Sequence, residues 1–241
     1  MVSISKVFTM TVLPEITQLC LYLFYIFLPV LALYIGYLIL TRAFNDMGFS
    51  SIEAIIIVFV SFIFGYGFID RYIGFSLANI QLFTYNNWLV GINVGGAVIP
   101  ILLSIYLSIK RKLDLKKILL GTLTVTIITF FVTYPAPEKG IVSPFPFWLL
   151  PAIFASFASL FLSYKNFRQA APLAYISGTL GVLVGADFLH LAELLNYSIE
   201  TPTSAVIGGA NVFDMVFITG ILAVVVDGII MFRQKSKEKL H

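Results

Sequence analysis

The chain of 241 residues is 59% hydrophobic and only 11% charged, and its apolar residues form runs of about 20. This composition excludes a soluble domain and predicts one all-α integral domain over residues 1–241, embedded in the lipid bilayer of the cell membrane. The net charge of +3 does not indicate a nucleic-acid partner, because the basic residues flank apolar runs and do not alternate with exposed aromatic residues.

Seven apolar runs predict a multi-pass bundle of seven transmembrane helices. The first run is predicted to span the membrane and not to act as a signal peptide, because it lacks a cleavage site of small residues. Segment 70–87 is the longest predicted loop, with interfacial aromatic residues. The predicted helices cover residues 15–40, 51–69, 88–108, 117–134, 146–164, 170–195 and 205–232.

The basic residues predict the orientation of these helices. Lys6, Arg71 and Lys139 fall on one side of the predicted membrane. Because cytoplasmic loops carry the excess of basic residues, the amino terminus is predicted to lie outside and the carboxyl terminus in the cytoplasm. The other twelve of the fifteen fall on the cytoplasmic side: Arg42, Lys110, Arg111, Lys112, Lys116, Lys117, Lys165, Arg168, Arg233, Lys235, Lys237 and Lys239.

Local signals support the predicted boundaries. Ser50 and Glu53 have the spacing of a capping box at the start of the second helix. Pro100 is predicted to kink the third helix, and Asn93 to satisfy freed backbone groups or a partner helix. Glycines at helical spacing predict close helix packing in the third and sixth helices: Gly91, Gly95, Gly178, Gly181 and Gly185.

Two aspartates interrupt the last two apolar runs, in GADFLHL (Asp187) and GGANVFDMVF (Asp214). An aspartate at the centre of a spanning helix costs about 2.5 to 3.5 kcal/mol, so both are expected to face the protein interior. The short connection between the two helices predicts antiparallel neighbours. Counting nine residues from Asn196 and from Ala205 places both carboxyls about 13 Å below the outer helix ends, so we expect them to interact.

Two facing carboxyls in a medium of low dielectric constant can share one proton and thereby supply an acid and a base. Such a pair can activate a water molecule to hydrolyse a peptide bond without any cofactor or metal. We therefore assign the catalytic role to Asp187 and Asp214. A membrane-embedded peptide is the expected substrate, and its predicted contacts are Gly208, Gly209, His190 and Asn211.

Long motifs resemble an uncharacterised family of prokaryotic polytopic membrane proteins, a domain of unknown function. They begin with RAF at Arg42 and continue through GINVGGAVIPILLSIYL, AAPLAYISGTLGVLVGADFLHL and IGGANVFDMVFITGILAV. The resemblance covers nearly the whole chain and implies a membrane protein but no activity.

The two aspartate segments also resemble the presenilin and signal-peptide-peptidase class of intramembrane aspartyl proteases. In that class a tyrosine precedes one aspartate and Gly-x-Gly precedes the other. Here Ala186 stands at the tyrosine position, and four residues separate Gly209 from Asp214. The Pro-Ala-Leu motif of the class has its nearest match in the sequence starting at Pro151, on an earlier helix. The resemblance implies that Asp187 and Asp214 are the catalytic pair.

Three other interpretations remain open. The two carboxyls can form a structural hydrogen bond between helices. Asp187, His190 and Glu193 lie within about 120° of one helix and, with Asp214, have the chemistry of a metal site. Alternatively, intramembrane carboxyls with His190 and Asn93 can carry protons or ions in a transporter. Asp227 is expected to reach toward Arg233 or water near the cytoplasmic end of the last helix.

The charge distribution predicts that the loop at 110–117 is cytoplasmic and the loop at 135–145 lies outside. Cysteines introduced at Asp114 and Glu138 should therefore react with impermeant reagents from opposite sides of the membrane. Labelling of both positions from the same side would contradict seven crossings.

Overall fold

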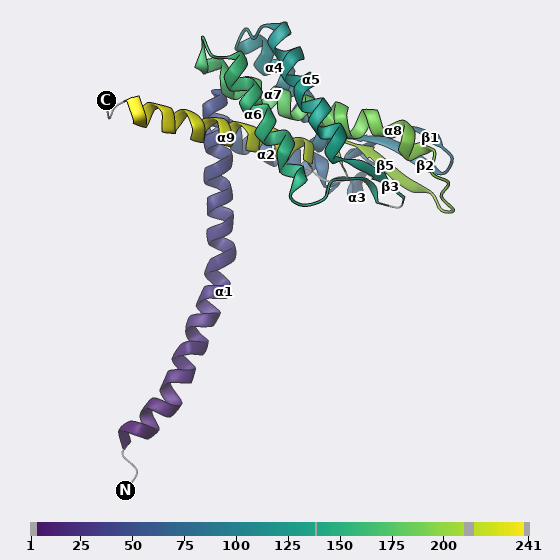
Figure 1. The fold of residues 1–241 in the computed structure, drawn as a ribbon. Coiled ribbons are helices and arrows are strands. Elements are labelled where there is room, and N and C mark those ends of the chain that lie inside the picture. The colour runs from purple at the N-terminus through teal and green to yellow at the C-terminus, as the bar shows by residue number, and fades with distance from the viewer. Residues whose placement is uncertain (1–3, 138, 210–214, 239–241) are drawn as a thin grey trace. The chain divides into compact units, whose positions relative to one another are not determined.

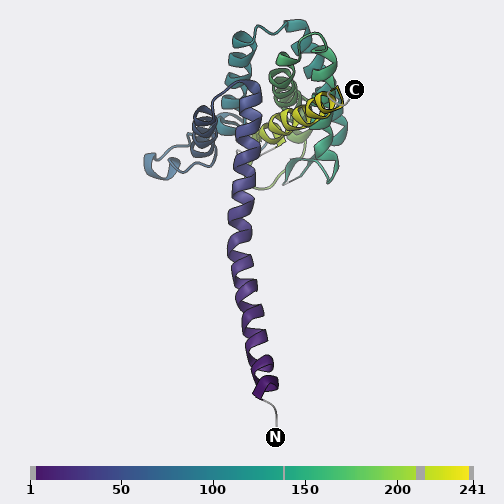
Figure 2. The same cartoon turned by 90° about the vertical axis from the view of Figure 1, so that its left-hand side faces the viewer.

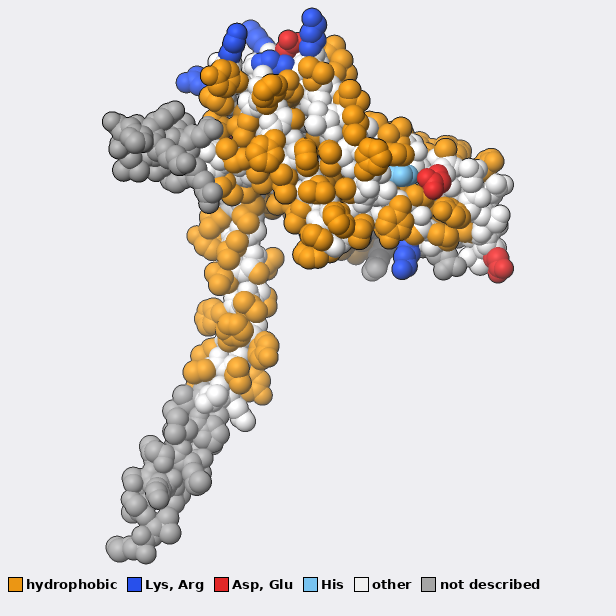
Figure 3. All heavy atoms as spheres, in the orientation of Figure 1, with side chains coloured by type: hydrophobic (Ala, Val, Ile, Leu, Met, Phe, Trp, Pro, Cys, Tyr) orange, Lys and Arg blue, Asp and Glu red, His pale blue; other side chains and the backbone are white. Residues whose placement is uncertain are grey.

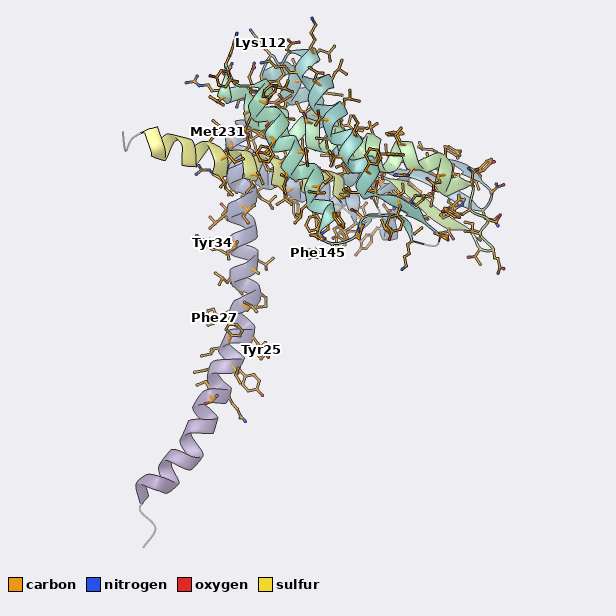
Figure 4. All side chains as sticks on the ribbon, viewed as in Figure 1. Tyr25, Phe27, Tyr34, Lys112, Phe145 and Met231 are labelled. Atoms are coloured by element: carbon orange, nitrogen blue, oxygen red, sulfur yellow. The ribbon has the colours of Figure 1, made fainter. Side chains whose placement is uncertain are left out.

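The computed structural model describes residues 4–137, 139–209 and 215–238 and divides into two units, Met1–Leu40 and Thr41–His241. Unit 1 consists of the first part of helix α1 (Ile4–Met47). Its described apolar side chains are exposed, including Tyr25, Phe27 and Tyr34 (Figure 4). An apolar helix of this length with no buried face is suited to contact lipid.

Unit 2 is mostly helical, which agrees with the predicted all-α class (Figure 1). It contains two short π-helices: η1 precedes α4, and η4 lies between α7 and α8. The helical segments that follow α1 are α2 (Ser51–Gly65), α3 (Asp70–Ile73), η1 (Val94–Val98), α4 (Ile99–Lys110), α5 (Leu115–Val132), η2 (Phe147–Leu149), α6 (Leu150–Leu162), η3 (Phe167–Gln169), α7 (Ala170–Val182), η4 (Leu183–Phe188), α8 (Leu189–Leu195) and α9 (Met215–Glu238).

Helix α7 is the centre of unit 2 and packs against α4, α5, α6 and α9 (Figure 2). A Cβ atom at Gly185 would lie 2.6 Å from the Thr126 carbonyl oxygen of α5, and one at Gly178 would lie 3.3 Å from Gly220 of α9. The prediction of close helix packing is thus confirmed for Gly178 and Gly185, but it is wrong for Gly91, which lies in a β-strand. The visible outer face of the unit is largely hydrophobic, and basic side chains gather where α4 and α5 are joined (Figure 3).

Three helices are long and apolar enough to cross a membrane: Thr17–Met47, Leu115–Val132 and Phe167–Leu195. Four shorter apolar helices accompany them: Ser51–Gly65, Val94–Lys110, Phe147–Leu162 and Met215–Met231. These segments correspond in order to the seven predicted runs. The structure therefore agrees with a membrane protein.

A three-stranded sheet replaces parts of two predicted helices. Its strand order is β1 (Asn79–Tyr85), β2 (Trp88–Asn93), β5 (Thr203–Ile207), with β1 antiparallel and β5 parallel to β2. The prediction of helix was therefore wrong at the start of 88–108 and of 205–232, and residues 79–85 are not loop. Hydrophobicity alone does not distinguish a short buried strand from a helix end. A smaller hairpin pairs β3 (Tyr134–Ala136) with β4 (Gly140–Val142).

The turn between β1 and β2 has the conformation of a tight β-hairpin. Asn86 and Asn87 have φ angles of 46° and 64°, and Tyr85 pairs with Trp88. Two consecutive residues with positive φ are typical of a two-residue hairpin turn, a conformation that asparagine tolerates. The Asn-Asn pair was thus a hairpin signal within the predicted loop.

The predicted roles of the capping box and of Asn93 are confirmed. The Ser50 N–H donates to Glu53 Oε2 at 2.7 Å, and the Glu53 N–H donates to Ser50 Oγ at 3.2 Å. Asn93 Nδ2 donates to the Gly65 carbonyl at 3.1 Å, and its Oδ1 accepts from the Gly96 N–H at 2.6 Å. Asn93 therefore connects α2 to the start of η1.

The predicted kink at Pro100 is not in the middle of an α-helix. Pro100 occupies the first turn of α4, directly after η1. The missing N–H of proline is tolerated in a first turn, where the fixed φ also favours the helix.

Asp70 organises the turn that leads from α3 into β1. It accepts hydrogen bonds from the Ser76 hydroxyl at 2.8 Å and from the Leu77 N–H at 2.8 Å, with a longer contact from the Ala78 N–H. Partial burial raises the pKa of Asp70, but the hydrogen bonds from Ser76, Leu77 and Ala78 outweigh it, so the pKa lies below its usual value.

This lowered pKa predicts an acid-sensitive turn. The contribution of Asp70 should be complete above the pKa of an unfolded aspartate and should be lost as pH falls through the lowered pKa of the folded state. Hydrogen exchange of the 70–79 amides, corrected for intrinsic rates, should show this loss in the wild type. Asp70→Ala should exchange quickly at every pH; protection equal to that of the wild type at neutral pH would contradict the assignment.

Candidate functional site

Asp187 lies in the π-helix η4, between α7 and α8, and only 7% of its surface is exposed. Its Oδ2 accepts a hydrogen bond of 2.6 Å from the Gly208 N–H, at the end of strand β5. π-Helices are rare and occur often at functional sites. The aspartate predicted to be catalytic thus occupies an irregular helical turn and is held by the backbone of a distant segment.

Gly208 and Gly209 form the turn that follows β5. Their φ angles are 83° and 76°, a region that favours glycine. A side chain on Gly208 would collide with Ala97 and Gly96 of η1. The two π-helices therefore meet at one glycine: η1 packs against Gly208, and η4 receives its N–H. Contact of a substrate with Gly208 and Gly209 stays a prediction.

Asp214 and Asn211 lie outside the described residues. Asp187 and Asp214 were expected at equal depth from a helical rise counted from Ala205, and this count is wrong because residues 203–207 form a strand. Asp214 directly precedes Met215, the first residue of α9 as the structure describes it. A direct contact between the two carboxyls therefore stays a prediction.

The His190 side chain faces α5. Its ring stacks on Phe130 with centroids 4.6 Å apart, and Nε2 lies 3.2 Å from the Phe130 carbonyl oxygen. Its Nδ1 lies 3.5 Å from Glu193 Oε2. His190 thus contacts α5, whereas Asp187 accepts the Gly208 N–H in the turn after β5. Within residues 4–137, 139–209 and 215–238, no three His, Cys, Asp or Glu residues are grouped as metal ligands.

The sheet beside the site has a packed core and an unpaired edge. Trp88, Val90, Leu194 and Ala205 form a buried cluster that joins α8 to the sheet, and Trp88 Nε1 donates to the Tyr197 carbonyl at 3.0 Å. Strand β5 pairs with β2 on one side. In the described part of the chain no strand pairs with its other edge.

The sequence analysis missed the contribution of η1 to this site. Gly96 and Ala97 contact Gly208, which in turn binds Asp187. The paired glycines at 95–96 and 208–209 were a usable signal, since glycine is needed where two backbones approach closely. The earlier interpretation assigned helix packing to Gly95, which does contact α2 at Ser61 and Gly65.

Comparison with known protein families finds one match: residues 71–226 match DUF1614, described as a protein of unknown function. The expected resemblance to an uncharacterised family is therefore confirmed, over a shorter range than the motifs suggested. No curated protein and no solved structure matches significantly. The resemblance to intramembrane aspartyl proteases gains no support from these comparisons.

The contacts of Gly208 predict that Gly208→Ala destabilises the protein more than Gly140→Ala. Both glycines have φ near 80°, but a Cβ at Gly140 meets no atom within 4 Å. Alanine at this positive φ should lower the free energy of unfolding by about 1 kcal/mol in both variants. The collision with η1 should lower it by a further 1 to 3 kcal/mol, roughly, in Gly208→Ala alone. Thermal unfolding in detergent compares the two variants. Equal losses would show that the contact with η1 contributes nothing.

Proposed function

We propose that this chain, which belongs to the DUF1614 family of proteins of unknown function, is an intramembrane aspartyl protease. Asp187 and Asp214 would form the catalytic pair. The substrate class would be peptides embedded in the membrane, because such chains can reach a buried site laterally. The proposal requires no cofactor.

The observation that carries this proposal is the position of Asp187. Its buried carboxylate accepts the Gly208 N–H at the end of β5, so the carboxyl is fixed beside a turn and an edge strand. An intramembrane carboxyl marks a functional site by default. A purely structural aspartate would not need the irregular π-helical turn in which Asp187 lies.

The chemistry would use both carboxyls in one hydrolytic step. One carboxylate removes a proton from water, and the water oxygen bonds to the peptide carbonyl carbon. The other carboxyl, which starts protonated, gives its proton to the leaving nitrogen as the C–N bond breaks. The products are one new carboxyl terminus and one new amino terminus.

The unpaired edge of β5 offers backbone groups to which an extended substrate peptide would bind. A peptide bond within an intact transmembrane helix is shielded, so the substrate must unwind before hydrolysis. An unwound chain in a membrane needs partners for its backbone groups. Addition of the extended peptide to β5 would supply these partners and lead its backbone to Gly208 and Asp187.

We extend the proposal to the topology of seven crossings, with the amino terminus outside and the carboxyl terminus in the cytoplasm. Lys112 lies in the loop before α5, and Phe145 lies in the loop between α5 and α6. The two residues are far apart in unit 2, which is in keeping with loops on opposite sides of the membrane (Figure 4). Helices of 15 to 17 residues span about 23 to 26 Å, less than the hydrocarbon thickness of about 30 Å. The buried strand β2 would lengthen the crossing that contains α4.

A cleavage assay tests the activity. The full chain in proteoliposomes is incubated with a reporter transmembrane peptide, and mass spectrometry identifies the new termini. Asp187→Asn and Asp214→Asn should each reduce cleavage by at least about 100-fold, because each removes an acid or base. Cleavage that continues in Asp214→Asn would exclude the aspartyl mechanism.

A control variant and two further measurements distinguish the protease from a metal enzyme and from a transporter. Asp114→Asn is a matched control, because Asp114 caps α5 in an exposed position and asparagine caps equally well. His190→Ala should reduce cleavage only modestly and chelators should have no effect, whereas a metal enzyme would lose activity in both cases. Proton or ion flux without cleavage, dependent on Asp187, would identify a transporter.

A further inference from the structure

A second carboxyl, Asp227 of α9, is fully buried inside unit 2. The expectation that it reaches water is therefore wrong, and the Arg233 side chain, its other predicted partner, lies outside the described side chains. Its Oδ2 has no hydrogen-bond partner among the described residues. An ionised carboxylate buried in this way is strongly unfavourable, so Asp227 requires a bound proton or another cation.

The hydroxyl beside Asp227 favours the proton. Ser159 Oγ of α6 lies 2.8 Å from the Ser156 carbonyl oxygen and 3.3 Å from Asp227 Oδ1. A serine hydroxyl has one proton, and a carbonyl oxygen can only accept. The hydroxyl can donate to either oxygen, and the shorter distance favours the Ser156 carbonyl. With its proton on that shorter contact, Ser159 Oγ forms a hydrogen bond with Asp227 only when the carboxyl carries a proton and donates it.

Asp46, near the end of α1, connects this position to the surface of unit 2. A Cβ atom at Gly228, the residue after Asp227, would lie 3.1 Å from Asp46 Oδ2. The two carboxyls are close enough for like-charge repulsion. The Asp46 side chain is 31% exposed and lies 3.4 Å from Arg42 Nε. A partly exposed carboxyl beside a buried one is suited to pass protons to it.

Among the side chains that the structure describes, few other charges lie near Asp227; the basic residues at 233–237 of α9 are outside that set. Helices α6, α7 and η1 pack against α9, and Tyr175 of α7 is the only titratable residue among them. Tyr175 contacts Gly220, about two turns from Asp227. Arg42 and Asp46 are the charged residues of the last turns of α1. Asp227 also lies twelve residues after Met215, about 18 Å along α9, so it is remote from the start of that helix.

We infer that Asp227 is a reversible proton-binding site between α6 and α9, loaded through Asp46. The site is separate from Asp187, which binds the Gly208 N–H in the turn after β5, and it does not depend on any hydrolytic activity. Loss of the proton would leave a bare charge at the α6–α9 contact, so the packing of these two helices would respond to the proton concentration at the end of the bundle.

Infrared spectroscopy of the full chain in lipid bilayers tests this inference. The wild type minus Asp227→Asn difference spectrum should contain the carbonyl band of a protonated carboxyl at neutral pH, and alkali should remove it. Asp46→Asn should move the midpoint of this titration to lower pH, because the repelling charge is lost. Asp114→Asn is the control and should leave band and midpoint unchanged.

If Asp227→Asn does not fold, two serine variants test the same inference. Ser159→Ala should shift the frequency of the band because the hydrogen-bond acceptor is removed. Ser177→Ala removes a buried hydroxyl that faces Gly121 of α5 and should not shift it. Absence of a protonated band at neutral pH overturns the inference. An ionised Asp227 band that requires sodium also overturns it, since the ligand would then be a metal cation.

Discussion

The hydrogen bond from the Gly208 N–H to the Asp187 carboxylate is the interaction on which the site depends. It joins segments that lie 21 residues apart in the chain and fixes the end of β5 beside η4. Gly208 in turn contacts η1, where the amide of Asn93 connects to α2. In an apolar environment each of these backbone groups must find a partner inside the protein. Two π-helices, an edge strand and a buried carboxylate are therefore held by one short turn, and its two glycines are the residues that permit this geometry.

The sequence was sufficient for the helical class and for the local signals that depend on neighbouring residues. The Ser50–Glu53 capping box and the packing of Gly178 and Gly185 follow from spacing along one helix, and both were predictable. The sheet was not, because β2 and β5 are apolar and short and their pairing depends on a partner far along the chain. Asp187 was found because a charge in an apolar run is conspicuous. Its partner, a backbone N–H, has no signature in the sequence other than the glycine that allows its approach.

Two aspartates in similar apolar runs have different surroundings. Asp187 meets a backbone N–H, which is always a donor. Asp227 lies beside a serine hydroxyl whose single proton has a second and closer acceptor in the Ser156 carbonyl. The first carboxyl has a donor of its own, whereas the second competes with a carbonyl for one proton. The His190 side chain is likewise oriented by its own contacts, which are the Phe130 ring and the Phe130 carbonyl oxygen. The local donors and acceptors, and not residue type, therefore separate the two sites.

The parallel pairing of β2 with β5 has a consequence for biosynthesis. Asn87, in the turn before β2, bonds to Ile199, and 112 residues separate the two. A hairpin such as β1–β2 can form as soon as it is made, but β2 must wait for its second neighbour until the helices from α4 to α8 have been synthesised. Throughout that interval one edge of β2 lacks its final partner, and Asp187 lacks the Gly208 N–H. The acidic centre is thus assembled among the last parts of the molecule. A chain that ends before Gly208 would contain the helices from α1 to α8 but would lack both α9 and the N–H group that binds Asp187.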